Sequence, residues 1–422
     1  MAGLETTEDP QRTGAEALIA ALGTQAGYDD PYPIYARLRE IAPVLLTASG
    51  VAYLTRYDDC LAVIRDTKLT GQNPEWMDTA SPGWRDHPGL RVTHESFVFR
   101  DPPDHTRLRR PVSGAFTHRQ AEALGDYIGG RIDSVLDAIA DAGADGSAVD
   151  LHELLATSLP ISVIGKVIGV SATDQELLRE PLQGLRLAVD GSRVASQLAT
   201  IDESAVALLG YFAGLVADRR AHPRDDLASA LATMDSPGSA ELDDGTPVMT
   251  EDELLQTLTL IFSAAIESTV DLLLNGTAAL LARPDQAALL RGDRGLAEGA
   301  VEEALRYDAP VQAIGRIPAS DLRIGEQAIP AGTFVVAMLG AANRDPARFT
   351  TPDTFDITRT GSAPLSFSGG VHHCLGAPLA RVQAARFFPA LLTRFPRLRA
   401  AGPLVRRGSV LRGFSHFPIA IR

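Results

Sequence analysis

The stretch that decides our interpretation of this chain is Phe367-Ser368-Gly369-Gly370-Val371-His372-His373-Cys374-Leu375-Gly376. It contains one of only two cysteines in 422 residues, with glycines four residues before it and two residues after it. Gly370 and Gly376 allow positive φ and a close approach of the backbone to a flat group. A helical pattern begins directly afterwards, and the N–H groups at a helix N-terminus favour a thiolate. The stretch therefore predicts a loop that presents Cys374 as a soft metal ligand.

Three interpretations of Cys374 compete. A zinc site is disfavoured because the adjacent His372 and His373 lie on opposite sides of an extended chain, and no second cysteine is near. A buried, inert cysteine is common in proteins, but it does not explain the flanking glycines or the aromatic Phe367. The third interpretation is an axial thiolate to haem iron, whose electron donation favours O–O cleavage.

The stretch resembles the haem-binding loop of the cytochrome P450 family. Phe367, Gly370, Cys374 and Gly376 occupy the positions of the family's pattern. The resemblance implies that Cys374 is the axial ligand of haem b (iron protoporphyrin IX). One departure is visible: the family usually has glycine directly after the phenylalanine, where this chain has Ser368. The serine affects the predicted turn of the loop, and the prediction that Cys374 is the iron ligand is unchanged.

Composition and charge restrict the class of protein. The chain is 45% hydrophobic and 22% charged, which is ordinary for a globular protein and sufficient for a sizeable core. Its formal net charge of −14 argues against general binding to nucleic acid or to anionic membranes. Cys60 and Cys374 do not form a disulfide framework. We therefore expect a soluble, cytoplasmic protein, and a monomer.

The domain organisation is predicted to be simple. Residues 1–12 are polar and acidic, without the pattern of a signal peptide or membrane anchor. We expect residues 1–28 to be weakly ordered and residues 29–422 to form a single haem domain. No long Pro/Gly/Ser linker divides the chain, and residues 235–247 are its most loop-like stretch. The motifs described below must also converge on one cofactor.

Hydrophobic periodicity and turn residues predict a mainly α-helical chain with a minor β region. Residues 70–91 show no periodicity and are predicted to form a long loop. The other elements expected from these patterns, in chain order, are a helix over 31–41, a hairpin over 44–54, a helix over 57–65, helices through most of 120–234, a strand over 310–316, and a hairpin over 324–337 that turns at 330–332. The family resemblance implies, in addition, a closing hairpin over 408–421.

A long central helix is the strongest prediction outside the cysteine loop. Thr250 and Glu253 form a capping box, and no proline follows until Pro284. One helix of about 30 residues can therefore span roughly 50 Å. It is apolar nearly all round, which indicates a buried helix. Glu267 and Asp271 interrupt the apolar run before about 20 residues accumulate, which argues against a membrane span.

The middle of this helix reads Ala264-Ala265-Ile266-Glu267-Ser268. A buried carboxylate is costly unless it has a partner or a purpose. Glu267 could reach an arginine or solvent, and Ser268 could bond the carbonyl four residues back. The resemblance implies instead an acid–alcohol pair that helps to deliver protons for dioxygen cleavage, with Ala264 and Ala265 next to the haem. The family usually has glycine in place of Ala265 and threonine in place of Ser268, and serine lacks the methyl group that restricts χ1.

His105 and Arg109 lie one turn apart on a helix that begins after two prolines. They could belong to a solvated basic face. The resemblance implies that both bond the haem propionates, together with Arg316 and His372. Cationic donors suit carboxylates that would otherwise be buried without partners.

Three further arginines, Arg107, Arg110 and Arg119, add positive charge to an acidic protein. They form either a docking face for an acidic electron donor or a simple solvated face. No flavin or nicotinamide fingerprint stands out, so the resemblance implies that a ferredoxin and its reductase supply electrons.

Glu303 and Arg306 lie three residues apart on a predicted helix, the spacing of an ordinary surface ion pair. The resemblance implies instead a buried pair that Arg359 completes. Such a triad would have a structural role behind the cysteine loop.

The combined motifs resemble the soluble bacterial type of the family over residues 30–422. They imply a triangular-prism helical domain with the long helix over the haem. The expected function is a haem-thiolate monooxygenase that uses dioxygen to hydroxylate or epoxidise a small lipophilic molecule in natural-product biosynthesis. Desaturation or oxidative coupling at the same haem is an alternative, as is a non-catalytic haem- or ligand-binding protein.

Overall fold

The computed structural model describes residues 10–188, 195–234, 248–408 and 410–422. Helices dominate these residues, as predicted. Their α-helices are α1 Pro10–Leu22, α2 Gln25–Asp29, α3 Tyr32–Ile41, α4 Tyr57–Arg65, α5 Pro74–Ala80, α6 Pro88–His94, α7 Asp104–Ser113, α8 His118–Ala123, α9 Gly125–Ala142, α10 Leu151–Ala156, α11 Leu159–Ile168, α12 Ala172–Leu177, α13 Arg179–Arg186, α14 Leu198–Ala221, α15 Leu227–Ala232, α16 Glu251–Ala282, α17 Pro284–Gly292, α18 Ala297–Tyr307, α19 Leu339–Ala342 and α20 Ala377–Arg394.

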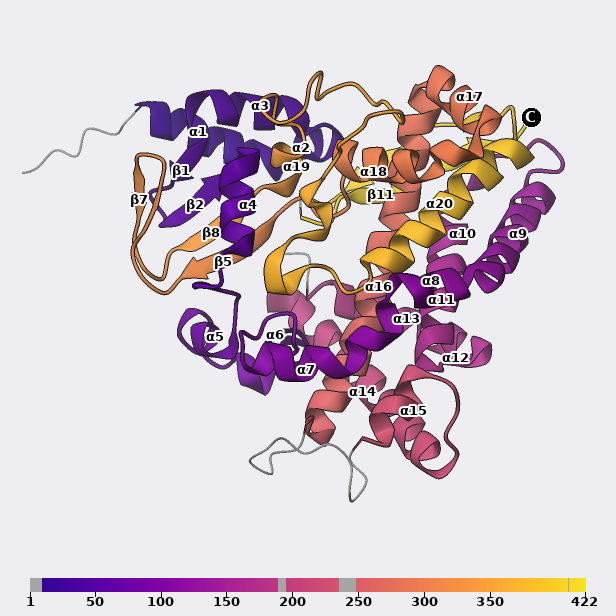
Figure 1. Cartoon of the computed structure of the whole chain (residues 1–422), viewed down its shortest axis with the longest axis horizontal. Coiled ribbons are helices and arrows are strands. Elements are labelled where there is room, and N and C mark those ends of the chain that lie inside the picture. The colour runs from indigo at the N-terminus through magenta and orange to yellow at the C-terminus, as the bar shows by residue number, and fades with distance from the viewer. Residues whose placement is uncertain (1–9, 189–194, 235–247, 409) are drawn as a thin grey trace, which may run out of the picture.

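The strands of the described residues form four separate sheets, of which the largest lies beside the N-terminal helices on the left of Figure 1. The strands are β1 Val44–Leu46, β2 Val51–Leu54, β3 Leu69–Thr70, β4 Val149–Asp150, β5 Ile314–Pro318, β6 Leu322–Ile324, β7 Gln327–Ile329, β8 Phe334–Ala337, β9 Arg399–Ala400, β10 Val405–Arg407, β11 Gly413–His416 and β12 Pro418–Ala420. The largest sheet has the order β1-β2-β8-β5-β3, in which β2 and β8 are parallel and the other pairs antiparallel.

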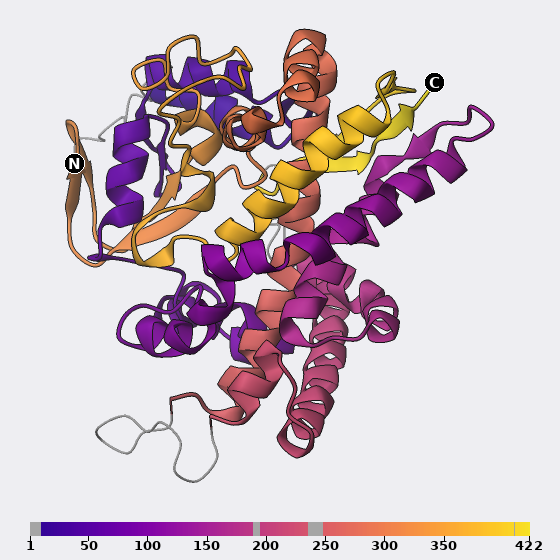
Figure 2. The same ribbon diagram turned by 45° about the vertical axis from the view of Figure 1, so that its right-hand side comes forward.

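The central helix forms as the sequence predicts. The Thr250 side chain accepts the N–H of Glu253, and the Glu253 carboxylate accepts the N–H of Thr250, so both halves of the capping box are present. α16 runs through the middle of the molecule in both views (Figures 1 and 2). Helices α10, α11, α14, α18 and α20 pack against it. The largest hydrophobic core surrounds it, and a smaller one lies between α4 and the sheet.

Three helical segments are apolar and long enough, by length and composition, to cross a membrane: Leu151–Ile168, Leu198–Ala221 and Glu251–Ala282. The sequence argument had excluded α16 on account of its two acidic residues. The structure adds that 72% of the most apolar window of α16 is buried inside the protein. Its apolar surface therefore packs against other helices.

Two predicted irregular regions contain helices. The expectation of weak order over residues 1–28 is wrong from residue 10 onward, because α1 and α2 form and Ala15 is fully buried; residues 1–9 lie outside the described part. The predicted loop over 70–91 contains α5 and the start of α6. The Asn73 side chain caps α5 and Pro74 follows it, a short start signal that a search for periodicity overlooks.

The predicted hairpin over 324–337 is also corrected. β6 pairs with β7 through a turn at Gly325, where φ is +59°. β8 leaves this hairpin and inserts between β2 and β5. Only Ile314 to Arg316 of the predicted strand 310–316 lies within β5. A closing hairpin forms from β10 and β11, but its first strand lies before the predicted range 408–421. The loop-like stretch 235–247 lies outside the described residues.

Candidate active site

The cysteine loop joins two short 3-10 turns to the start of α20. The N–H of Cys374 donates to the carbonyl of Phe367 across 2.9 Å, which closes the loop on itself. Gly376 caps α20, and the N–H groups of Gly376 and Ala377 point at the sulfur, as expected for a thiol ahead of a helix. The loop therefore presents one sulfur with backbone donors behind it.

Cys374 is accessible to solvent and yet lies deep among protein atoms. Burial raises the pKa of its thiol, although the two N–H groups and Arg109 act in the opposite direction. The N–H groups at the start of α20 therefore favour the thiolate, as expected from the sequence, while burial opposes them. A bound cation would supply the missing positive charge, because coordination deprotonates a thiol.

The two glycines of the motif differ in their backbone. Gly370 has φ +63°, and a Cβ there would lie 3.0 Å from the carbonyl oxygen of Ile64, so glycine is required on both counts. Gly376 has φ −81° with open space beside it, which corrects the expectation of positive φ. The second strained position is Ser368, with φ +58° and ψ −155°. Almost only glycine adopts this conformation.

We expect the variant Ser368→Gly to stabilise the protein by about 1 kcal/mol. The strain at Ser368 costs of order 1–3 kcal/mol, whereas a glycine costs about 0.5–1 kcal/mol through the entropy of the unfolded chain. Urea unfolding measures the difference. Ser366→Gly is the matched control and should destabilise, because Ser366 donates to the carbonyl of Leu305 across 2.6 Å. A less stable Ser368→Gly would contradict the strain argument.

His105 and His372 meet beside this loop. Their ring centroids are 4.5 Å apart at an interplanar angle of 62°, although the residues come from α7 and from the loop. His105 is 3% exposed, and neither of its ring nitrogens has a hydrogen-bond partner among the described residues. Burial and the charge of Arg109 lower the pKa of His105 to about 4. A buried imidazole without partners indicates that a ligand completes its hydrogen bonding.

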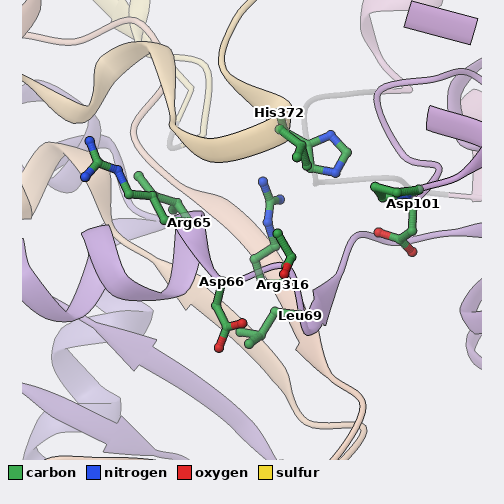
Figure 3. A pocket seen from close by; sticks show the side chains of 10 residues that line it. Arg65, Asp66, Leu69, Asp101, Arg316 and His372 are labelled. Atoms are coloured by element: carbon green, nitrogen blue, oxygen red, sulfur yellow. The ribbon is translucent and has the colours of Figure 1, made fainter. Parts of the chain in front are cut away.

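Arg316 lies on β5, and its side chain points toward His372 in Figure 3. Arg316 and His372 line one small pocket together with Asp101 and the end of α4. Within the described residues, the Arg316 guanidinium donates only to the neighbouring carbonyl of Gly315, across 2.8 Å. Burial lowers its pKa and nearby Asp101 opposes this change. It is a buried cation with spare donors.

Arg109 behaves differently from the other predicted cationic donors. Its guanidinium donates to the loop carbonyls of Val371, across 3.0 Å, and His373, across 2.5 Å. It thus ties α7 to the cysteine loop. The prediction that Arg109 binds a propionate stays open, because these contacts use two of its five donors.

The residues present fit a haem. His105 and His372 offer imidazole N–H donors, and the buried Arg316 adds a positive charge. Donors of this kind suit the carboxylates of a flat, otherwise apolar group. The sulfur of Cys374 lies two residues along the loop from His372. No group of three or more His, Cys, Asp or Glu that could hold a metal ion occurs in the described ranges.

The middle of α16 is open where the rest of the helix is buried. Ala264 is exposed, and Ala265, Glu267 and Ser268 are partly exposed, between long buried segments on both sides. The Ser268 hydroxyl donates to the carbonyl of Ala264 across 3.0 Å, the local bond considered from sequence. This part of the helix is therefore available to a ligand and carries a hydroxyl next to a carboxylate.

The partner of Glu267 is Arg407 of β10, and the pairing could not be located from sequence. The same guanidinium nitrogen donates to Asp271, one turn further along α16, across 2.8 Å. The sequence argument used Asp271 only as a break in the apolar run. The spacing of four residues between Glu267 and Asp271 on a buried helix could have indicated from sequence that the two carboxylates lie on one helix face.

The predicted triad comes together. Arg306 donates to both oxygens of Glu303 across 2.7 Å, and Arg359 adds contacts at 3.2 and 3.3 Å. Glu303 and Arg306 are at most 1% exposed, so the surface-pair interpretation is wrong. Arg306 also donates to the carbonyls of Asn343, Pro352 and Thr354, the segment that leads to the cysteine loop.

One predicted docking residue has another role. Arg107 is partly buried and bridges Asp104 and Glu253, at 3.0 and 2.7 Å, so it holds α7 to the start of α16. It therefore does not belong to an exposed basic face. Arg110 and Arg119 are exposed.

The comparisons with known proteins agree with this geometry. Residues 216–399 match the family model described as Cytochrome P450. The chain is 38% identical to cytochrome P450 107B1 of Saccharopolyspora erythraea, over 92% of this chain and 95% of that protein. It is 37% identical to the cytochrome P450 monooxygenase PikC of Streptomyces venezuelae, over 98% and 96% of the two chains. The crystal structure of P450BioI in complex with acyl carrier protein ligated to hexadec-9Z-enoic acid superposes with a TM-score of 0.85 at 32% identity, over 94% of this chain and 99% of that one.

Proposed function

The chain belongs to the cytochrome P450 family, and from this premise we propose that it is a haem-thiolate monooxygenase that inserts one oxygen atom of dioxygen into a lipophilic small molecule. The observation that carries the proposal is the contact between the buried His105 and the partly buried His372 beside the loop of Cys374. The ring nitrogens of His105 lack partners among the described residues. These residues are arranged for a planar group that bears carboxylates and takes one sulfur ligand.

The residues near the cysteine loop would share the work of binding the haem. Cys374 would hold the iron, and His105, His372 and Arg316 would bind the propionates, while Arg109 keeps the loop on α7. When bound, the haem supplies the dioxygen chemistry and the oxidation of substrate. The open stretch of α16 with Ala264 and Ala265 would face it. Ser268, whose hydroxyl donates to the carbonyl of Ala264 across 3.0 Å, and the partly exposed Glu267, which Arg407 contacts, would relay protons from solvent along this stretch.

The substrate and the electron donor are proposed at the level of class. An apolar substrate is supported by the likeness to P450BioI, whose complex carries a fatty acyl chain. A ferredoxin with its reductase is the proposed donor, because electron supply in the bacterial branch is typically of this kind. Arg110 and Arg119 remain exposed for its docking. We expect the enzyme to act in the cytoplasm.

The test is product formation with a surrogate ferredoxin, its reductase and NADPH. Lipophilic compounds and fatty acyl chains that perturb the haem spectrum serve as substrates. We expect NADPH-dependent products that have gained one oxygen atom. Products that have only lost two hydrogens would favour desaturation, and coupled products would favour oxidative coupling. Spectral binding without any product would favour the non-catalytic alternative and contradict the proposal.

A further inference from the structure

Two carboxylates of the central helix share one guanidinium. Glu267 and Asp271 lie one turn apart on α16, and Nη2 of Arg407 donates to Oε1 of Glu267 and to Oδ1 of Asp271. Arg407 comes from the C-terminal hairpin, whose strand β11 packs on α16, and its Nε donates to the carbonyl of Phe414 across 3.2 Å. The hairpin therefore fixes the position of the guanidinium relative to the helix.

Asp271 occupies a site that does not suit a second negative charge. Its side chain is 0% exposed, and its Oδ2 has no hydrogen-bond partner among the described residues. A Cβ on Gly413 would lie 1.6 Å from Oδ1, so the hairpin backbone is pressed against the carboxyl group. An ionised carboxylate in such a site is costly unless its charge is matched.

The positive charges around Asp271 are not sufficient to balance an ionised carboxylate there. Arg407 is shared with Glu267, which is itself partly exposed. Arg406 is engaged by Asp308 and Asn275, at 2.5 and 2.7 Å. The charge of Arg186 of α13 also acts to lower the pKa of Asp271, and the partly buried His152 of α10 lies near Glu267. Burial is the main cause that raises the pKa of Asp271; Glu267 adds to it, and Arg407 opposes it.

Asp308 shows the opposite arrangement in the same protein. It is equally buried, but it receives hydrogen bonds from two arginines, Arg406 and Arg412, at 2.5 and 2.7 Å. Although burial opposes them, these charges hold the pKa of Asp308 below its usual range. Two guanidinium groups serve one carboxylate there, whereas one guanidinium serves two carboxylates at Asp271. The number of matched charges therefore separates the two sites.

We propose that Asp271 is protonated at neutral pH and acts as a positioning residue, so that the charge of Arg407 is left to hold Glu267 as a carboxylate on the hairpin side of α16. In this state the carbonyl oxygen of the neutral acid accepts the bond from Arg407. The protonation state concerns the polypeptide alone. The effect on Glu267 deepens the monooxygenase function proposed above and rests on it.

If Asp271 is protonated in the folded protein, its contribution to the free energy of unfolding should fall as pH rises. An acid whose pKa is raised in the folded state keeps its proton there while the unfolded chain loses it. The stabilisation is therefore complete below the usual pKa of aspartic acid and declines as pH rises toward the folded pKa. From about pH 5 to about pH 7, this single group raises the unfolding equilibrium constant about tenfold per pH unit.

The variant Asp271→Asn tests this directly, because an amide imitates the protonated acid without titrating. Urea unfolding of the purified haem-loaded protein is measured from pH 5 to pH 7 for wild type and variant. We expect the wild-type constant to rise relative to the variant by about tenfold per pH unit. Asp285→Asn, an exposed carboxylate on α17, is the matched control and should run parallel to wild type. Parallel curves for Asp271→Asn would overturn the proposal.

A second measurement tests whether Asp271 positions Glu267 through Arg407. Product formed per NADPH consumed should fall several-fold in Asp271→Leu, which removes the acceptor of Arg407, and should be restored in Asp271→Asn. Equal losses in both variants would overturn the positioning role. If Asp271→Leu does not fold, an infrared carbonyl band of a protonated carboxyl group, present in wild type and absent in Asp271→Asn, decides the protonation state. Absence of any product in wild type would reject the monooxygenase function, while the unfolding curves would still decide the state of Asp271.

Discussion

A Cys374→Ser variant is expected to fold and to lose the absorption band of the reduced, CO-bound protein after which the family is named, together with all NADPH-dependent product formation. Cys374 provides the one sulfur of the loop, with backbone donors of Gly376 and Ala377 behind it. A thiolate is a strong, soft, electron-donating ligand to haem iron. A serine hydroxyl in the same place is harder and stays protonated, so the electronic basis of the band disappears.

The chain contains its own control for this experiment. Cys60 is fully buried in the core between α4 and the sheet, and its thiol donates to the carbonyl of Leu54 across 3.3 Å. A serine at position 60 can make the same bond, so Cys60→Ser should keep the band. Circular dichroism and haem content separate loss of ligation from loss of fold. A Cys374→Ser protein that retains the band would contradict the assignment of the ligand.

The sequence carried most of the information where interactions are local. The capping box of Thr250 and Glu253 predicted the start of α16, because both partners lie within one turn. The spacing of His105 and Arg109 predicted that the two share a helix face, since residues four apart do so, while the family resemblance alone implied that this face meets the cysteine loop. The spacing of Glu303 and Arg306 predicted their contact in the same way, while their burial came only from the family resemblance.

Contacts between residues far apart in the chain could not be predicted from the sequence. Arg407 lies 140 positions from Glu267 in the chain, and no local pattern indicates that the two meet. β8 leaves the predicted hairpin because β2, far earlier in the sequence, offers a parallel edge. The strain at Ser368 depends on a backbone conformation that only the folded loop imposes. These features are set by tertiary contacts that override local preference.

The last prediction concerns two neighbouring glutamates on α18. Glu303→Gln should destabilise the protein by about 3–5 kcal/mol, because removing one partner of a buried ion pair leaves the other charge uncompensated. Here the substitution would leave two guanidinium groups without their carboxylate. Arg306 is 0% exposed and bonds both oxygens of Glu303, and Arg359 contacts the same carboxylate. The N–H of Asp356 also donates to Glu303, across 2.9 Å.

Glu302→Gln is the matched comparison, with the same chemical change one residue earlier. Glu302 pairs with Arg381 of α20 across 2.6 Å, but the two side chains are 27% and 38% exposed. Solvent screens such a pair, so the loss should be at most about 1 kcal/mol. Urea unfolding followed by circular dichroism measures both variants. Equal losses, or a larger loss for Glu302→Gln, would show that burial does not govern the strength of the triad. A large loss for Glu303→Gln alone would establish it as the anchor of the segment behind the cysteine loop, since Arg306 reaches the carbonyls of Asn343, Pro352 and Thr354 only while Glu303 holds its guanidinium.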